Sequence, residues 1–173
     1  MKRLLATFVL LVAGPLALAD GLESLETFMR TTQSARADFT QVVTSPTRDG
    51  QAARQKTSSG SFEFQRPGRF RFVYKKPFEQ VIVADGQTLW FHDVDLNQVT
   101  RRSQARALGS TPAALLASAP DLQALRADFT LSSAPDQDGL QWVLAVPKAK
   151  DGQLQSVRVG LRDAQLAVLE ILD

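Results

Sequence analysis

The stretch that decides the fold of this chain runs from Gly60 to Arg71 and has the sequence GSFEFQRPGRFR. Phe62 and Phe64 alternate with polar residues, which is the pattern of a strand with one apolar face. Arg66 continues the phase of the two phenylalanines. This phase directs its guanidinium toward the apolar side, where a cation is costly unless its donors find acceptors. The alternative is that the side chain, placed just before a turn, extends outward into water and has no such role.

The next residues predict that the strand turns back on itself. Pro67 and Gly68 fit the two central positions of a type II turn, which accepts proline first and needs a positive φ second. After the turn, Phe70, Phe72 and Tyr74 alternate with residues of the opposite face. Together these patterns predict an antiparallel hairpin with an aromatic face.

Residues 1–19 are typical of a secretory signal peptide. A basic start is followed by a short apolar run over 4–18 and by a small-x-small cleavage site that ends at Ala19. We expect cleavage between Ala19 and Asp20 and export to the periplasm. The alternative is a membrane anchor, which the shortness of the run disfavours.

Charge and composition exclude several kinds of partner. The chain of 173 residues contains 20 basic and 18 acidic side chains. Removal of Lys2 and Arg3 with the signal segment leaves a mature domain close to neutral, which does not favour nucleic acid. The sequence has no cysteine, so disulfides, thiol nucleophiles and thiolate metal sites are excluded. The length favours one domain over residues 20–173.

Strand patterns dominate the rest of the chain. A helix is predicted first, because apolar residues recur at the spacing of an amphipathic helix at Leu22, Leu25, Phe28 and Met29. A second short helix is predicted over 113–119, where a threonine and a proline provide the N-terminal signals. Strands are predicted at 36–44, 58–65, 69–74, 80–84, 88–92, 96–102, 127–133, 140–146, 153–161 and 165–172.

This order of elements predicts an α+β fold that is mainly β. We expect a single curled antiparallel sheet, an incomplete β-barrel, whose open side is covered by short helices. The run from Leu89 to Phe91 lacks clean alternation and is typical of a strand covered on both sides. Core packing and ligand contact explain Trp90, within this run, equally well.

Catalytic and metal chemistry find little support in the sequence. His92 is the only histidine, and Asp93 and Asp95 are its sequence neighbours, an arrangement more typical of a solvated turn than of a triad or a cation site. Arg69 and Arg71 beside aromatic residues also resemble an RNA-binding sheet, but export and neutral charge oppose that interpretation. We expect no enzyme activity, no metal and no cofactor.

Several motifs in order resemble the LolA family of periplasmic carriers of outer-membrane lipoproteins. The resemblance covers residues 20 to 172. It rests on Ala37-Asp38-Phe39-Thr40-Gln41, on the stretch from Gly60 to Phe72, on Pro77-Phe78-Glu79-Gln80, on Asp85 to Phe91 and on Thr111-Pro112 with Leu115-Leu116.

The resemblance implies a periplasmic chaperone that shelters lipoprotein acyl chains in an apolar cavity. It implies two membrane partners, an inner-membrane lipoprotein-releasing ABC transporter and an outer-membrane lipoprotein receptor, and we expect the carrier to be a monomer. It also implies that Arg66 bonds to carbonyls of the covering helices and locks this lid, and that loading partners act near Phe70. Residues expected to line the cavity are Leu22, Leu25, Phe28, Phe62, Phe64, Phe70, Phe72, Trp90, Leu115 and Leu116.

Two departures from the carrier interpretation stay open. Family members usually continue beyond the position of Asp173, so either the C-terminus is shortened or the chain is a divergent member, and an unpaired last strand at 165–172 would be an aggregation risk. The alternative function is a periplasmic lipid-binding or lipoprotein-sensing module of the same fold that shuttles nothing.

Overall fold

The computed structural model describes residues 20–45, 54–107, 119–150 and 154–173. Antiparallel strands make up most of it, which confirms the prediction of a mainly β fold. The helices are α1 (Gly21–Thr31), α2 (Gln104–Ala107) and α4 (Leu122–Asp128). The strands are β1 (Ser34–Ser45), β2 (Arg54–Gln65), β3 (Arg69–Lys76), β4 (Gln80–Asp85), β5 (Thr88–Asp93), β6 (Gln98–Ser103), β7 (Phe129–Gln137), β8 (Leu140–Pro147), β9 (Ser156–Arg162) and β10 (Gln165–Leu172).

The predicted first helix and the predicted strands are confirmed, with ends that shift by a few residues. β2 begins earlier than the alternation predicted, because its first residues are polar and exposed yet pair with β1. The predicted signal peptide and the predicted helix at 113–119, with Leu115 and Leu116, lie outside the described residues.

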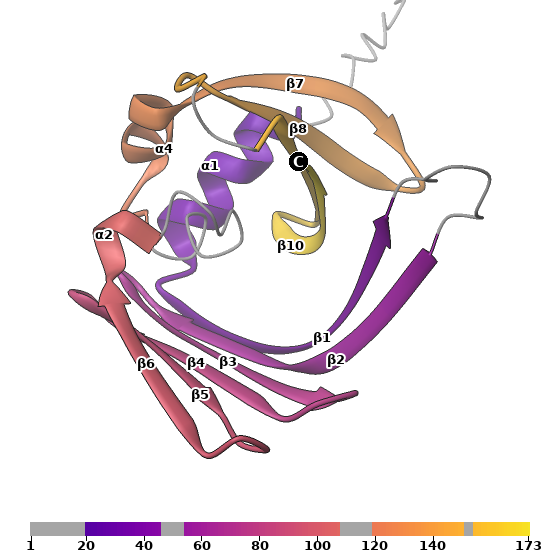
Figure 1. Ribbon diagram of the computed structural model, residues 1–173. Helices are drawn as coiled ribbons and strands as arrows, with labels where there is room; N and C mark the ends of the chain where they lie inside the picture. Colours follow the sequence, from indigo (N-terminus) through magenta and orange to yellow (C-terminus); the bar gives the residue numbers. More distant parts are fainter. Residues whose placement is uncertain (1–19, 46–53, 108–118, 151–153) are drawn as a thin grey trace, which may run out of the picture.

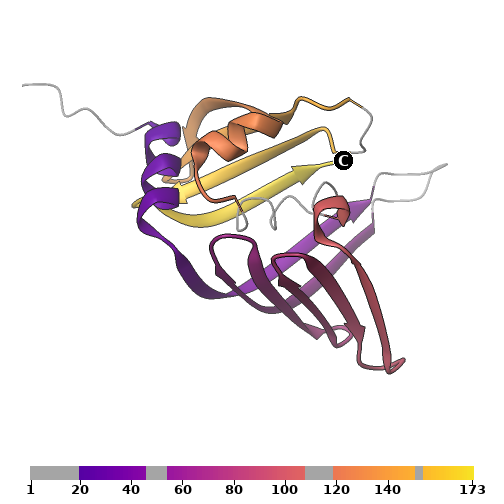
Figure 2. The same cartoon turned by 90° about the vertical axis from the view of Figure 1, so that its left-hand side faces the viewer.

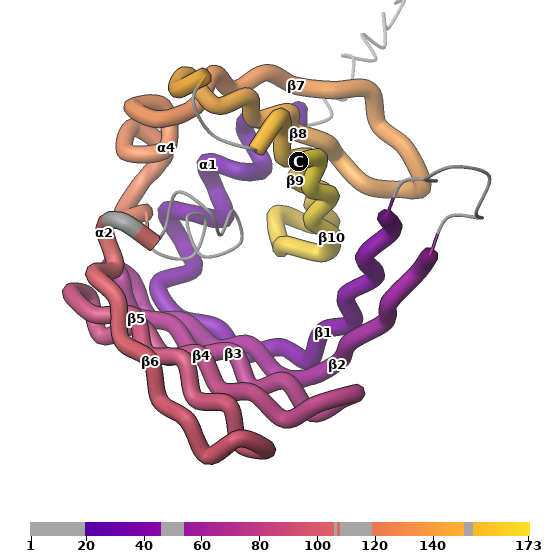
Figure 3. Tube along the Cα trace, viewed as in Figure 1, coloured from indigo at the N-terminus to yellow at the C-terminus, as the bar shows by residue number. Residues whose placement is uncertain are grey.

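The prediction of a single curled sheet is wrong. The strands form a six-stranded sheet in the order β1 to β6 and a four-stranded sheet in the order β10-β9-β8-β7 (Figure 1). β6 and β7 lie in different sheets, and within the described residues α2 and α4 come between them in the sequence. The six-stranded sheet curves, and its concave side faces α1 and the other sheet (Figures 1 and 3).

Helix α1 lies across the four-stranded sheet (Figure 2). It begins at Gly21 because the Asp20 side chain caps it by accepting from the Glu23 N–H over 2.9 Å. A Cβ at Gly21 would lie 2.3 Å from the Trp142 carbonyl oxygen, so only glycine lets the helix approach β8 this closely. The predicted apolar face is buried at Leu25, Phe28 and Met29.

The buried core sits between α1, the four-stranded sheet and one end of the six-stranded sheet. Its members from the four-stranded sheet include Val143, Val159 and Leu161, which are almost fully buried. Phe64, Phe70 and Leu89 join the core from the six-stranded sheet. The rest of the concave face, farther along the strands, contains side chains that are only partly buried.

The connection between β2 and β3 differs from the predicted two-residue turn. Gln65 pairs with Arg69, so three residues form the loop. Gly68 has φ of +75°, as the glycine signal predicted, and the bond between Arg66 and Pro67 is cis. The Arg66 N–H donates to the Gln33 carbonyl over 2.8 Å, which continues the pairing of β1 with β2 by one residue beyond Ser34 and Gln65.

Candidate functional site

The concave face of the six-stranded sheet is built from three cross-strand rows, which we call rungs. Their members follow from the strand register, because residues two apart on a strand share a face. The inner rung is Ala35, Phe64, Phe70, Ala84, Leu89 and Arg102. The middle rung is Ala37, Phe62, Phe72, Ile82, Phe91 and Thr100. The outer rung is Phe39, Gly60, Tyr74, Gln80, Asp93 and Gln98.

Burial of the aromatic side chains decreases from the inner rung to the middle rung. Phe64 and Phe70 of the inner rung are 8 % and 4 % exposed and belong to the core. Phe62 and Phe72 of the middle rung are only partly buried, and their rings stack with centroids 4.2 Å apart. The middle rung therefore offers an aromatic surface that the folded chain leaves incompletely covered.

Gly60 interrupts the aromatic face and leaves room for side chains of the two neighbouring strands to meet. The register of β2 and β3 shifts between Ser59 and Gly60, which marks a β-bulge. A Cβ at Gly60 would lie 2.0 Å from the Val73 carbonyl oxygen. Because no side chain stands there, Phe39 of β1 and Tyr74 of β3 meet above it with ring centroids 5.1 Å apart.

The prediction that Trp90 lines the cavity is wrong. Its neighbours Leu89 and Phe91 point to the concave face, so the pleat turns Trp90 to the opposite face. Its side chain is 36 % exposed, and its Nε1 donates to the Asp85 carboxylate over 3.3 Å. In this run of three apolar residues, Leu89 and Phe91 thus face the core and Trp90 lies on the opposite face of the sheet.

Arg66 points toward the apolar side, as its phase predicted. The residue is 6 % exposed, and its guanidinium carbon lies 4.8 Å from the centroid of the Phe64 ring and 5.3 Å from that of Phe28. Its Nε donates to the Thr32 carbonyl over 3.0 Å, and its Nη1 donates to the Ala119 carbonyl over 3.1 Å. Burial lowers the pKa of the guanidinium.

These contacts join three separate parts of the chain. Thr32 is the C-cap of α1, where helix carbonyls lack partners within the helix, and Ala119 precedes α4. The side chain therefore ties the end of α1 and the segment before α4 to the turn between β2 and β3. The face of a ring attracts a cation, so Phe28 and Phe64 compensate part of the lost hydration.

The structure also shows where the predicted cavity residues on α1 lie. Leu25 is completely buried in the core, and Leu22 packs against it. Phe28 links the helix to the inner rung, because its ring contacts that of Phe64 at a centroid distance of 6.4 Å. Of the predicted residues on α1, Phe28 thus has a defined ring contact with the concave face.

Sequence reasoning missed Gln104, a buried glutamine beside the same turn. The side chain is 3 % exposed. Its Nε2 donates to the Gly68 carbonyl over 2.6 Å, and its Oε1 accepts from the Gly86 N–H over 3.0 Å. It joins the β2–β3 turn to the β4–β5 turn, and no periodic pattern surrounds it that would have predicted this role.

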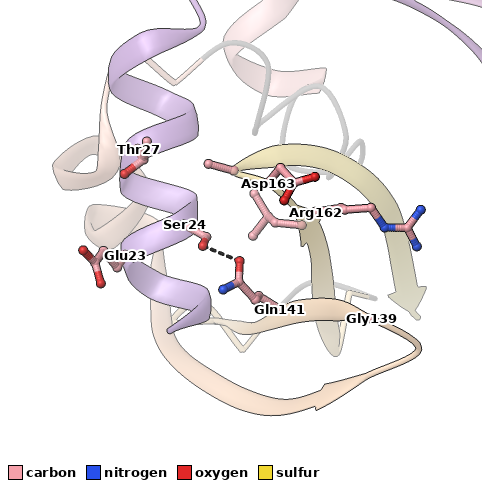
Figure 4. Close-up of a pocket in the computed structure, with 9 residues that line it drawn as sticks. Glu23, Ser24, Thr27, Gly139, Gln141, Arg162 and Asp163 are labelled. Atoms are coloured by element: carbon pink, nitrogen blue, oxygen red, sulfur yellow. Dashed lines mark hydrogen bonds between the residues drawn. The ribbon is translucent and has the colours of Figure 1, made fainter. Parts of the chain in front are cut away.

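A pocket of about 460 Å³, lined by both polar and apolar residues, lies beside α1 and away from the rungs. The pocket is lined by Glu23, Ser24 and Thr27 of α1, by Gln141 of β8 and by the turn between β9 and β10, and the Ser24 side chain points toward Gln141 (Figure 4). The Ser24 hydroxyl donates to the Gln141 Oε1 over 2.5 Å. Its lining shares no residue with the aromatic face and includes the charged side chains of Glu23, Arg162 and Asp163, which do not suit a hydrocarbon chain.

The described residues include neither a metal-ligating cluster nor a helix that could span a membrane. They contain no group of three or more histidine, cysteine, aspartate or glutamate side chains placed to hold a metal ion. Within the same ranges, none of the helices has the length and hydropathy needed to span a bilayer. His92 lies on the convex face, in the row of Val81 and Val99.

Comparison with known proteins identifies the family. The model of the family described as "Outer membrane lipoprotein carrier protein LolA" matches residues 30–173. The chain belongs to the LolA family. Three relatives are each named outer-membrane lipoprotein carrier protein. The relative from Albidiferax ferrireducens is 68% identical over 172 residues, which cover 97% of this chain and 81% of that protein.

The other two relatives are more distant. The protein from Leptothrix cholodnii is 57% identical over 157 residues, covering 91% of this chain and 70% of its own. The protein from Methylibium petroleiphilum is 54% identical over 164 residues, covering 95% and 77%. The predicted membership of the LolA family is thereby confirmed.

Proposed function

We propose that this chain is a carrier of outer-membrane lipoproteins that shelters their acyl chains against the concave face of the six-stranded sheet. Family membership supports the carrier role. The observation that carries the proposal is the incomplete burial of the middle rung, where Phe62 and Phe72 stack but stay partly exposed. An apolar surface kept on one concave face is suited to a mobile hydrocarbon ligand.

The contacts of Arg66 support a locking role for that side chain. Burial of acyl chain contributes about 0.8 kcal/mol per methylene, so several chains in an empty rigid site would approach the ceiling of non-covalent affinity, about 18 to 21 kcal/mol. A carrier that binds this tightly cannot release its passenger. The passenger must therefore displace protein contacts of similar strength.

Those contacts are the ones that Arg66 organises. The Phe28–Phe64 ring contact and the hydrogen bonds from Arg66 to Thr32 and Ala119 hold α1 and the segment before α4 against the inner rung. Each hydrogen bond from a charged donor contributes roughly 1.5–3 kcal/mol. Loading breaks them and release restores them, so the net affinity is a difference between two large terms.

The proposal includes the setting in which the carrier works. It is exported to the periplasm by the signal peptide at 1–19 and acts there as a monomer. It receives acylated lipoproteins from an inner-membrane ABC transporter and delivers them to an outer-membrane receptor. It has no enzymatic step, because binding and release are sufficient for transport.

Purification of the protein from a periplasmic extract tests the carrier function. We expect triacylated or diacylated lipoproteins to co-purify, as identified by mass spectrometry. Phe72→Asp in the middle rung should abolish this, whereas Val73→Asp on the opposite face of the same strand should not. Recovery of phospholipid without lipoprotein supports a lipid-binding or sensing module instead, and recovery of neither contradicts both functions.

A further inference from the structure

The chemistry of the concave face changes between the middle rung and the outer rung. The middle rung is apolar from β1 to β5, whereas the outer rung carries a phenol, two amides and a carboxylate on β3 to β6. The two rungs are two residues apart along each strand, a separation of about 6.6 Å. A polar boundary therefore runs along one side of the aromatic surface.

The polar groups of the outer rung differ in what they bind within the protein. The Asp93 carboxylate accepts from the Leu96 N–H over 3.0 Å and is used by its own hairpin turn. The Tyr74 hydroxyl donates to the Gln41 Oε1 over 3.3 Å, farther along β1. In the described part of the chain, the side-chain amides of Gln80 and Gln98 make no hydrogen bond to protein.

We propose that Gln80 and Gln98, on the polar side of Tyr74, bind the neutral ester and amide linkages that join acyl chains to the first residue of a lipoprotein. This inference rests on the proposed carrier function. The chains then lie on the middle rung, and their carbonyl groups reach the outer rung, where amide N–H groups donate to them. The passenger polypeptide leaves past the hairpin tips between β3 and β4 and between β5 and β6.

The charge of the outer rung determines which lipid it selects. The rung contains no lysine or arginine, and Asp93 adds a negative charge beside Gln80 and Gln98. A phosphate group is usually held by basic side chains and is repelled by a carboxylate. Neutral linkages of an acylated peptide therefore fit this rung, and the anionic headgroup of a phospholipid does not.

The test compares ligands that share a chain length and differ in the polar group. The probes are a dipalmitoylglyceryl-cysteine peptide, hexadecanol and dipalmitoyl phosphatidylglycerol, each competing with a fluorescent acyl probe on the purified protein. Gln80→Leu combined with Gln98→Leu removes the two amides. Gln65→Leu, exposed on the opposite face of β2, is the matched control, and thermal unfolding verifies that all variants fold.

We expect the double variant to bind the lipopeptide at least tenfold more weakly, since one hydrogen bond is worth about fivefold. Its affinity for hexadecanol should stay within twofold, and the control should match the wild type on every probe. Equal weakening for both ligands, no weakening for either, or a wild-type preference for the phospholipid overturns the inference alone. A wild-type protein that binds no acyl probe overturns the carrier function and this inference together.

Discussion

The Nε of Arg66 donates to the carbonyl oxygen of Thr32 over 3.0 Å, so a hairpin of one sheet holds the C-terminal end of a helix that lies on the other. The same guanidinium donates to the carbonyl of Ala119, which lies in the chain segment between β6 and β7. One side chain therefore couples the two sheets at the edge of the aromatic face. Removal of the Arg66 side chain should therefore let the two sheets move more independently of each other.

Arg66→Leu should loosen the end of α1 and keep the passenger from leaving. The variant loses the charged hydrogen bonds to Thr32 and Ala119 but retains apolar volume, so we expect faster hydrogen exchange in the last turn of α1 with a folded core. Transfer of a loaded lipoprotein to outer-membrane receptor should fall at least tenfold. Arg69→Leu, exposed on the next strand, is the control, and wild-type delivery by Arg66→Leu would contradict the locking role.

Gly60→Ala should destabilise the protein more than an exchange of glycine for alanine usually does. The added Cβ meets the Val73 carbonyl oxygen at 2.0 Å, and backbone on both strands must shift. We expect a loss of about 2–3 kcal/mol in the free energy of unfolding, measured by urea denaturation. Ser58→Ala, two residues away on the same face, should change it by less than about 0.5 kcal/mol.

Gln104→Met tests the bridge between the two turns beside Arg66. Methionine fills a similar volume but leaves the Gly86 N–H and the Gly68 carbonyl without the partners they have in the native protein. Each unsatisfied group costs about 1–3 kcal/mol when buried. We expect a lower thermal unfolding midpoint than for Gln65→Met, an exposed position; equal midpoints would show that water replaces the bridge.

The sequence predicts those features of the fold that depend on local interactions, and it does not predict those that depend on contacts between distant parts of the chain. The period-2 alternation of β2 and β3 correctly predicted which residues of the hairpin face inward, Arg66 included, because the pleat fixes side-chain direction within one strand. The division into two sheets was not predictable in this way. Alternation does not specify which distant strand becomes a neighbour, and β6 and β7 are separated by the helical segment.

The roles of individual residues also differ in how well the local sequence predicts them. Gly60 stands inside a strand pattern, a signal for a bulge that the alternation of its neighbours obscured. Trp90 was ambiguous because three apolar residues in a row fit either face. Gln104 gave no signal, since its two partners come from turns that only the folded sheet brings together.

Phe70→Glu illustrates how burial changes an expectation based on sequence. The resemblance placed loading partners near Phe70, yet the side chain is 4 % exposed within the core. A carboxylate there should lower the free energy of unfolding by about 3 kcal/mol or more and reduce capture through loss of fold. Phe78→Glu, at a position 64 % exposed, should leave stability unchanged; a stable Phe70→Glu variant that fails only in capture would restore the partner interpretation.

Tyr74 should report both on alkaline stability and on occupancy of the concave face. Burial raises its pKa above the ordinary value of 10.0, because desolvation disfavours the phenolate. Its contribution to stability is therefore complete below the pKa of the unfolded chain and is lost as the pH rises through the folded pKa. Tyr74 is the only tyrosine, so absorbance at the phenolate band follows this group alone.

We expect a titration midpoint above 10 in the folded protein and near 10 in denaturant. Bound acyl chains should raise the folded midpoint further, because they exclude more water from the phenol beside the middle rung. Tyr74→Phe should abolish the absorbance change and reduce the alkaline loss of stability. A midpoint that acyl ligands leave unchanged would place the hydrocarbon away from the junction of the middle and outer rungs.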